Sequence, residues 1–327
     1  MIDVLREIKP KNPILIAAWP GMGQVALYAA RYLKDKLKCR LFARLRGRDF
    51  FYQTDIAIRD SVIDLQDYPE GKFYYWENKA GGQDVIIFLS EMQPQAEKFV
   101  AYTKEIIDFV CALDVKMILT FAAMVTSVDY VRSPKVRLAV THKDVVQQLF
   151  KSNVKPLKTG QISGLNGFLL GVAKEKNIPG ACFLGEIPFY ATQIENPRTS
   201  HAILNAVSKF LGVSLDLSEL SIAARKIEEE LGRLMDFVNK SAEEEDLSEY
   251  EPSPISIDDV EKIKNLLAKQ KMLPHSTKKQ IEELFSKAQE NISSAADLKK
   301  TLDEWHVYKD YEDRFLELFK KEDTQER

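Results

Sequence analysis

Short apolar runs that alternate with amphipathic helical segments constrain the fold of this chain most strongly. Residues 13–19 form an apolar run that is too short for a helix, and residues 24–37 then carry apolar side chains at helical spacing. The apolar run at 84–89 is likewise followed by a helical pattern that begins near Pro94. Buried strands separated by crossover helices are typical of a mostly parallel sheet with helices on both faces. The sequence therefore predicts a three-layer α/β/α domain.

The alternation continues as far as residue 211. Further apolar runs lie at residues 115–121, 136–140 and 180–184, and helical patterns lie at 142–151, 164–176 and 197–211. Residues 50–80 differ, because they are rich in aromatic side chains and end in an Ala-Gly-Gly turn signal. We expect extra antiparallel strands in that stretch.

The pattern changes after residue 216. Residues 220–238 place apolar side chains along one face of a long amphipathic helix. The segment 241–256 carries six acidic residues, no basic residue and two prolines, which is typical of a linker, and helical patterns follow it. We therefore expect an α/β domain over residues 1–240, an acidic linker over 241–256 and a helical extension over 257–327.

Charge and composition argue against several classes of protein. The net charge of −3 comes without a patch of clustered lysine and arginine beside aromatic residues, so we expect no nucleic-acid partner. No stretch approaches the roughly 18 consecutive apolar residues of a membrane span, so we expect no membrane partner. The cysteines Cys39, Cys111 and Cys182 are far apart and lack metal-ligand spacing. We expect no metal site and a reducing cytoplasmic location.

The first candidate motif is the stretch Gly-Met-Gly-Gln-Val-Ala at residues 21–26, which fits the G-x-G-x-x-A dinucleotide fingerprint. In that fold the glycines let a pyrophosphate approach a helix N-terminus. The acid that should end the second strand is missing, because Asp49 lies past the strand and follows Gly47-Arg48. The alternative is that Gly21 and Gly23 only shape a tight strand-to-helix turn. The missing acid favours this alternative, and we expect no cofactor.

Two polar loops supply the remaining candidates. Residues 159–164 contain hydroxyl groups and glycines before a helix, which either bind an anion or serve the helix through a Ser163 cap and close packing. Residues 185–198 follow a buried strand and contain two carboxylates and an amide. This second loop either binds a substrate or performs acid–base work, or it is an ordered loop in which Asn196 starts a helix and Glu195 serves its dipole.

In a parallel sheet, all three loops would follow the carboxyl ends of strands and could converge. The candidate ligand crevice then consists of Gly21, Gly23, Thr159, Gly160, Ser163, Gly164, Glu186, Gln193 and Glu195. The four histidines are scattered, and neither a P-loop nor a G-x-S-x-G elbow is present. No catalytic residue can be named from these patterns.

Three segments together carry a family resemblance. They are "PILIAAWPGMGQVALYAARYL", "TGQISGLNGFLLGVAKEKNIPGACFLGEIPFYATQIENPRTSHAILNAV" and "ELSIAARKIEEEL". They resemble the proteasome assembly chaperone 2 family, whose prokaryotic members are often labelled as possible ATP-grasp enzymes. The resemblance implies an α/β domain similar to purine nucleoside phosphorylases, commonly assembled into homo-oligomers, and implies no established catalytic residue. Some archaeal relatives bind the proteasome through a C-terminal hydrophobic–tyrosine–any tripeptide, whereas this sequence ends Gln325-Glu326-Arg327.

Two functions follow from these observations. The first is a non-catalytic, homo-oligomeric scaffold or assembly chaperone, linked to the proteasome or to another complex, with the C-terminal helices as a further surface for a protein partner. The alternative is an enzyme or a binder of a nucleotide, nucleoside or phosphate that uses the phosphorylase-like crevice. We favour the first.

Overall fold

The computed structural model describes residues 2–52, 56–59, 61–65, 67–128, 130, 132–243, 275–290, 294–304 and 307–320. The chain divides into two units. One comprises residues 1–124, 131–187 and 193–234, and the other comprises residues 125–130, 188–192 and 235–327. The final helix before the predicted linker continues through Glu243, and residues 244–256 of that linker lie outside the described residues.

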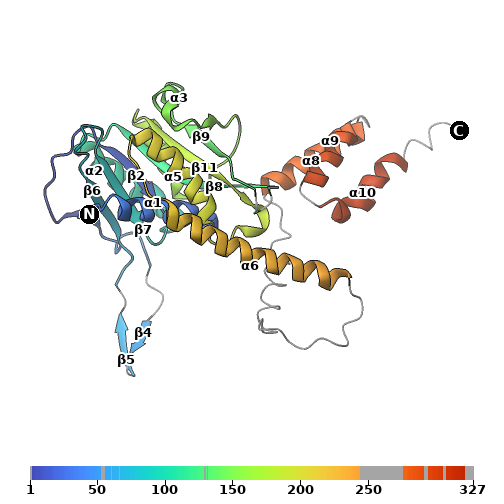
Figure 1. Ribbon diagram of the computed structural model, residues 1–327, viewed down its shortest axis with the longest axis horizontal. Helices are drawn as coiled ribbons and strands as arrows, with labels where there is room; N and C mark the ends of the chain where they lie inside the picture. Colours follow the sequence, from blue (N-terminus) through green and yellow to red (C-terminus); the bar gives the residue numbers. More distant parts are fainter. Residues whose placement is uncertain are drawn as a thin grey trace. The chain divides into compact units, whose positions relative to one another are not determined.

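A nine-stranded sheet forms the centre of the first unit (Figure 1). Its strands, in spatial order, are β1 (Ile2–Val4), β3 (Arg40–Leu45), β6 (Gly71–Trp76), β7 (Val85–Ser90), β2 (Ile14–Ala18), β8 (Met117–Thr126), β11 (Gly180–Pro188), β9 (Val136–Val140) and β10 (Lys155–Pro156). The predicted α/β class is confirmed. A separate two-stranded sheet pairs β4 (Ile56–Arg59) with β5 (Val62–Leu65), so residues 50–80 supply antiparallel strands as predicted.

The sheet is mixed, which corrects the expectation of a mostly parallel one. Strand β2 runs parallel to β7 and β8, and β10 runs parallel to β9. Strands β1, β3, β6 and β7 are successively antiparallel, and β11 is antiparallel to β9. The reason lies in the connections: β6 ends at Trp76 and β7 begins at Val85, and so short a loop joins antiparallel neighbours, whereas a parallel pair needs a crossover.

Two pairs of helices cover the sheet. Helix α1 (Val25–Lys36) packs on α5 (Pro197–Leu211), and α2 (Phe99–Ala112) packs on α4 (Leu165–Glu175). Leu15, Ala17 and Trp19 share one buried cluster with side chains of α2 and α4, while α1 contacts β2 and β7. Because alternate residues of a strand face opposite sides, the two helix pairs lie on opposite faces of the sheet. This arrangement gives the three layers that the sequence predicts.

The predicted helix over residues 142–151 is shorter than expected. Helix α3 spans only Val145–Gln148, and single 3-10 turns lie at Phe150–Ser152 and, elsewhere, at Met22–Gln24, Ala96–Lys98 and Phe189–Ala191. Asn153 then takes a left-handed conformation and ends the turn. The chain is thereby redirected into the short strand β10.

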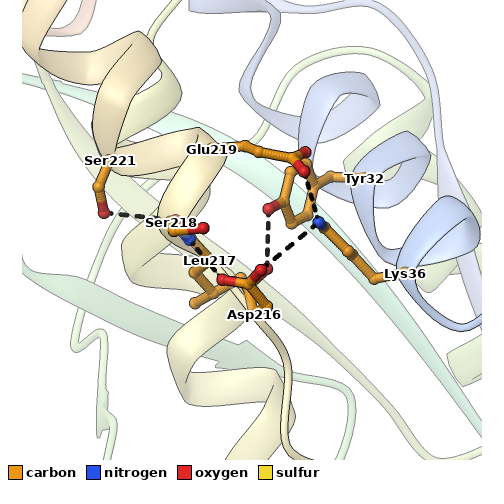
Figure 2. Close-up of polar contacts among 7 residues, drawn as sticks. All are labelled: Tyr32, Lys36, Asp216, Leu217, Ser218, Glu219 and Ser221. Carbon is orange, nitrogen blue, oxygen red and sulfur yellow. Dashed lines mark hydrogen bonds and ion pairs between the residues drawn. The ribbon is translucent and has the colours of Figure 1, made fainter.

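The start of helix α6 (Ser218–Glu243) is fixed to helix α1 by a polar cluster (Figure 2). Tyr32 donates a hydrogen bond from its hydroxyl to the carbonyl oxygen of Asp216 (2.8 Å), and Lys36 pairs with the Glu219 carboxylate (2.8 Å). The Lys36 ammonium also lies 5.1 Å from the centre of the Tyr32 ring. Exposed pairs of this kind stabilise the folded state only weakly, so this cluster orients α6 relative to α1 more than it stabilises the protein.

Burial of the apolar face of α6 supplies the larger share of its attachment. Leu220, Ala224 and Leu231 are buried, as the amphipathic pattern predicts. Farther along the helix, Glu228 makes a bidentate contact with the guanidinium of Arg198 on α5. The first half of α6 is therefore an integral part of the first unit.

The C-terminal helices have their own core, which confirms the predicted helical extension. They are α8 (His275–Glu290), α9 (Ala295–Glu304) and α10 (Tyr308–Lys320). Ile281, Phe285 and Leu298 are fully buried among these helices. The Arg314 guanidinium makes two hydrogen bonds to the Glu282 carboxylate (2.7 and 2.6 Å), which lower the pKa of Glu282. These contacts join α8, α9 and α10 in one buried cluster.

Two glycines near α4 differ in the space around them, and this difference can be tested. An added Cβ at Gly180 would lie 2.9 Å from the Ile118 carbonyl oxygen and 2.8 Å from Leu170 Cδ2, whereas one at Gly171 would meet nothing within 4 Å. We expect Gly180→Ala to lower the free energy of unfolding by about 1–3 kcal/mol through overpacking. Gly171→Ala, in a helix interior, should leave it unchanged or raise it by about 0.5–1 kcal/mol. Urea denaturation measures both, and equal effects would contradict this account of the packing.

Candidate functional site

Another segment of the chain packs against the glycine-rich turn after β2. Gly23 has a φ of 60°, which glycine adopts most readily. Its carbonyl oxygen accepts a hydrogen bond from the Asn196 backbone N–H (2.9 Å), and an added Cβ would lie 3.4 Å from the Ile194 carbonyl oxygen. The loop around residues 194–196 thus lies against the glycine that a dinucleotide fingerprint would turn towards a pyrophosphate. This geometry favours the interpretation in which the glycines shape a tight strand-to-helix turn.

The N-terminus of α4 is capped from a distant segment. Gly164 is the N-cap residue with a φ of 74°, and no local side chain caps this end, so the prediction of a Ser163 cap was wrong. The Leu165 N–H instead donates to Gln93 Oε1 (2.9 Å). The Gln93 amide also donates to the Pro20 carbonyl oxygen (2.7 Å). Gln93 therefore joins the loop after β7 to both the turn after β2 and the start of α4.

Asn166 makes the second long-range link at this edge of the sheet. Its buried side chain accepts a hydrogen bond from the Trp19 N–H (3.1 Å) and donates one to the Trp19 carbonyl oxygen (3.2 Å). The Thr120 hydroxyl donates to the Asn166 carbonyl oxygen (2.6 Å). Both backbone polar groups of Trp19, just past the end of β2, are satisfied by this one side chain. Sequence reasoning did not find Asn166 or Gln93, because each acts across more than 70 positions of the chain.

Only part of the predicted crevice lines the pocket beside this link. Gly21, Ser163 and Gly164 line a pocket of about 180 Å³ together with Gln93 and Asn166. That volume is below the roughly 300 Å³ of the smallest usual ligand sites, and no charged side chain lines the pocket. It lacks the basic groups that would hold a phosphate.

Thr159 and Gly160 lie elsewhere, in a larger pocket of about 470 Å³ between β9, the loop that follows β10, and α4. Gly23, Glu186, Gln193 and Glu195 line neither pocket. The structure therefore does not bring the predicted crevice residues into a single cavity. Thr159 and Gly160 follow β10, which runs parallel to β9 and therefore opposite to β11, so the carboxyl ends of β10 and β11 lie at opposite edges of the sheet.

Glu186 is a structural carboxylate. Its Oε2 accepts a hydrogen bond from the Lys135 N–H (3.0 Å), and its own N–H donates to the Lys135 carbonyl oxygen (3.0 Å). Asn196 caps α5 by accepting the Thr199 N–H at Oδ1 (3.0 Å), with Pro197 in the first turn of that helix. These contacts favour a structural role for residues 185–198. The predicted loop is shorter than expected, because residues 185–188 extend β11 and α5 begins at Pro197.

The described residues offer little reactive chemistry. Burial raises the pKa of the Cys39 and Cys182 thiols to about 12, so neither forms a thiolate nucleophile at neutral pH. His142 Nδ1 lies 2.9 Å from the Thr141 hydroxyl. Within the part of the chain that the structure describes, no group of three or more histidine, cysteine or acidic side chains is placed to hold a metal ion.

The chain belongs to the PAC2 family, whose model matches residues 15–235. It is 26% identical over 262 residues to an uncharacterised protein of Methanocaldococcus jannaschii, covering 78% of this chain and 94% of that protein.

Solved structures show the same similarity. Pyrococcus furiosus PbaB, described as an archaeal proteasome activator, is 28% identical with a TM-score of 0.62, covering 72% of this chain and 98% of that chain. Pyrococcus furiosus PbaA, described as an archaeal homolog of proteasome-assembly chaperone, is 21% identical with a TM-score of 0.55, covering 74% of this chain and 94% of that chain.

The Asn166 link can be tested by removing its polar groups at constant size. We expect Asn166→Leu to lower the free energy of unfolding by about 2–6 kcal/mol, because two buried backbone groups of Trp19 lose their partners at about 1–3 kcal/mol each. Gln161→Leu, at an exposed position lining the same pocket, should change it by less than about 0.5 kcal/mol. Urea denaturation gives both values, and an Asn166→Leu variant as stable as Gln161→Leu would contradict the link.

Proposed function

We propose that this chain is a non-catalytic, homo-oligomeric scaffold that assists the assembly of a protein complex, with the proteasome as the first candidate. Membership of the PAC2 family supports this proposal, as does the similarity to a protein described as a proteasome activator. The candidate site supports it too, because the polar side chains of Gln93, Asn166 and Glu186 hydrogen-bond to the backbone and hold the fold together. No helix in the described residues is long and apolar enough to cross a membrane.

The exposed apolar face of the β4–β5 hairpin is the observation that carries the proposal. Ile58 pairs with Ile63 across the hairpin, and Ile56 lies two positions away on the same face. Their exposed fractions are 59% for Ile56, 74% for Ile58 and 71% for Ile63. Apolar side chains gathered and exposed in this way mark interaction surfaces. A two-stranded sheet is also only marginally stable alone, so a partner on this face would stabilise it.

A second copy of the chain is the partner that this geometry favours. Both strands of the hairpin have an open edge, because β4 and β5 pair only with each other among the described strands. Around a two-fold axis the apolar faces of two hairpins can pack against each other, so that Ile58 and Ile63 meet their own copies, while the open edges leave the strands accessible to the partner. The hairpin would thereby support the homo-oligomer that the proposal requires.

Charge substitution on the two faces of the hairpin tests this interface. We expect Ile58→Lys combined with Ile63→Lys to shift the chain to smaller species, because the interface would bury lysine ammonium groups without partners. Light scattering after size-exclusion chromatography measures the mass. Val62→Lys, on the opposite face, is the matched control and should assemble as the original chain does.

The same three proteins also address the assembly role. Incubated with separately produced proteasome subunits, the original chain and Val62→Lys should increase the yield of assembled particles on native gels, and the double variant should not. An original chain that is monomeric at every concentration would contradict the oligomer, and an unchanged yield of particles would contradict the assembly role.

A further inference from the structure

The larger pocket is an open groove along one edge of the sheet. Its floor is the strand β9 with the turn after it (residues 138–141), and its walls are residues 156–160 and the α4 positions Gly171 and Lys174. We call this the edge groove. Its volume of about 470 Å³ is within the range of binding sites, and Leu138, Leu157 and Leu170 make much of its lining apolar.

Strand β9 offers unpaired backbone groups to this groove. Thr141 donates its N–H to the Gly180 carbonyl oxygen on β11, so in the antiparallel ladder the polar groups of Thr141 face β11 and those of Val140 face the other way. On that other side, β10 pairs only with Arg137 and Leu138, and Leu157 then donates to the Leu138 carbonyl oxygen. Among the described residues no backbone partner reaches the N–H or C=O of Val140. The sheet edge is therefore open where the groove lies.

The charge of the groove is positive. Lys158 and Lys174 line it, and no acidic residue does, although the chain as a whole carries a net charge of −3. The neighbouring Lys155 on β10 is also exposed. A ligand that brings carboxylates to the ends of the groove and apolar side chains to its floor would complement both properties.

The lack of a side chain at Gly171 keeps the groove wide. It is exposed on α4, and an added Cβ there would meet nothing within 4 Å. Gly167, one turn earlier, is instead required for packing, because an added Cβ would lie 2.6 Å from Ile162 Cγ2. Packing within the chain therefore does not explain the glycine at 171, and a larger side chain there would occupy only the groove.

We propose that the edge groove binds an extended segment of a partner protein, in which acidic residues accompany apolar ones, as an added strand beside β9. The inference deepens the proposed scaffold function, on which it rests, by naming the surface that receives a client subunit. Main-chain hydrogen bonds to Val140 would fix the segment, and the lysines would select its charge. An open strand edge favours an extended peptide over a compact small molecule, because the peptide alone supplies a matching backbone donor and acceptor.

Peptide display against the full chain tests this inference. We expect the enriched peptides to combine acidic and apolar residues, and labelled copies should bind the original chain more weakly as salt is raised. Their affinity should fall at least about tenfold for Gly171→Trp, which fills the groove, and for Lys174→Glu, which reverses its charge. Lys176→Glu is the matched control, since Lys176 follows on the same segment without lining the groove, and it should bind as the original chain does.

The outcomes separate this inference from the function on which it rests. Circular dichroism must show that Gly171→Trp is folded, and Lys174→Glu provides the independent variant. The proposed peptide site would be overturned by enrichment of basic peptides, by no enrichment, or by peptides that bind Gly171→Trp as tightly as the original chain. If anilinonaphthalene sulfonate raises the melting temperature while no peptide binds, the groove binds a small amphipathic anion and the peptide proposal is overturned. If the hairpin variants still alter assembly in that case, the proposed scaffold function stands and only the peptide site in the edge groove is refuted.

Discussion

The layered structure depends on how the central strand β2 ends. Asn166 of α4 satisfies both backbone groups of Trp19, and Gln93 satisfies the neighbouring Pro20 carbonyl oxygen together with the first N–H of α4. A buried backbone group without a partner costs about 1–3 kcal/mol, so these two amides hold α4 at the edge where an α/β protein usually keeps its ligand. The side chains of Asn166 and Gln93 at this edge therefore make structural hydrogen bonds within the chain.

The fingerprint-like turn after β2 is likewise packed against other parts of the chain. The chain around Ile194 and Asn196 packs directly against Gly23. Glu186 is held by the Lys135 backbone and lines neither described pocket. What the molecule presents outward instead is an apolar hairpin and a basic edge groove. The hairpin is inserted between β3 and β6, and the groove lies by β9 and β10 at the other end of the sheet order, so the two surfaces are formed by separate parts of the sheet.

Much of the fold follows from local patterns, whereas most of the candidate site does not. The strand β2, the helix α1 and the buried face of α6 were predictable because apolar spacing reports burial directly. Asn196 as an N-cap was foreseeable because capping is local. The mixed sheet was not, since strand direction depends on which distant strands pair. Gln93 and Asn166 were also missed, because their partners are remote in sequence, and local rules instead suggested Ser163 as the cap.

A protein that acts through a partner-binding surface and a protein that acts through a ligand crevice differ in which residues become protected on binding. Hydrogen–deuterium exchange of the full chain, compared at low and high protein concentration and with added nucleotides and phosphate, distinguishes the two. For the proposed scaffold, we expect a higher concentration to slow exchange in residues 56–65, and added ligands to leave exchange in residues 21–24 and 161–166 unchanged. Ligand-dependent protection of residues 21–24 and 161–166, with no concentration dependence in the hairpin, would contradict the proposed scaffold.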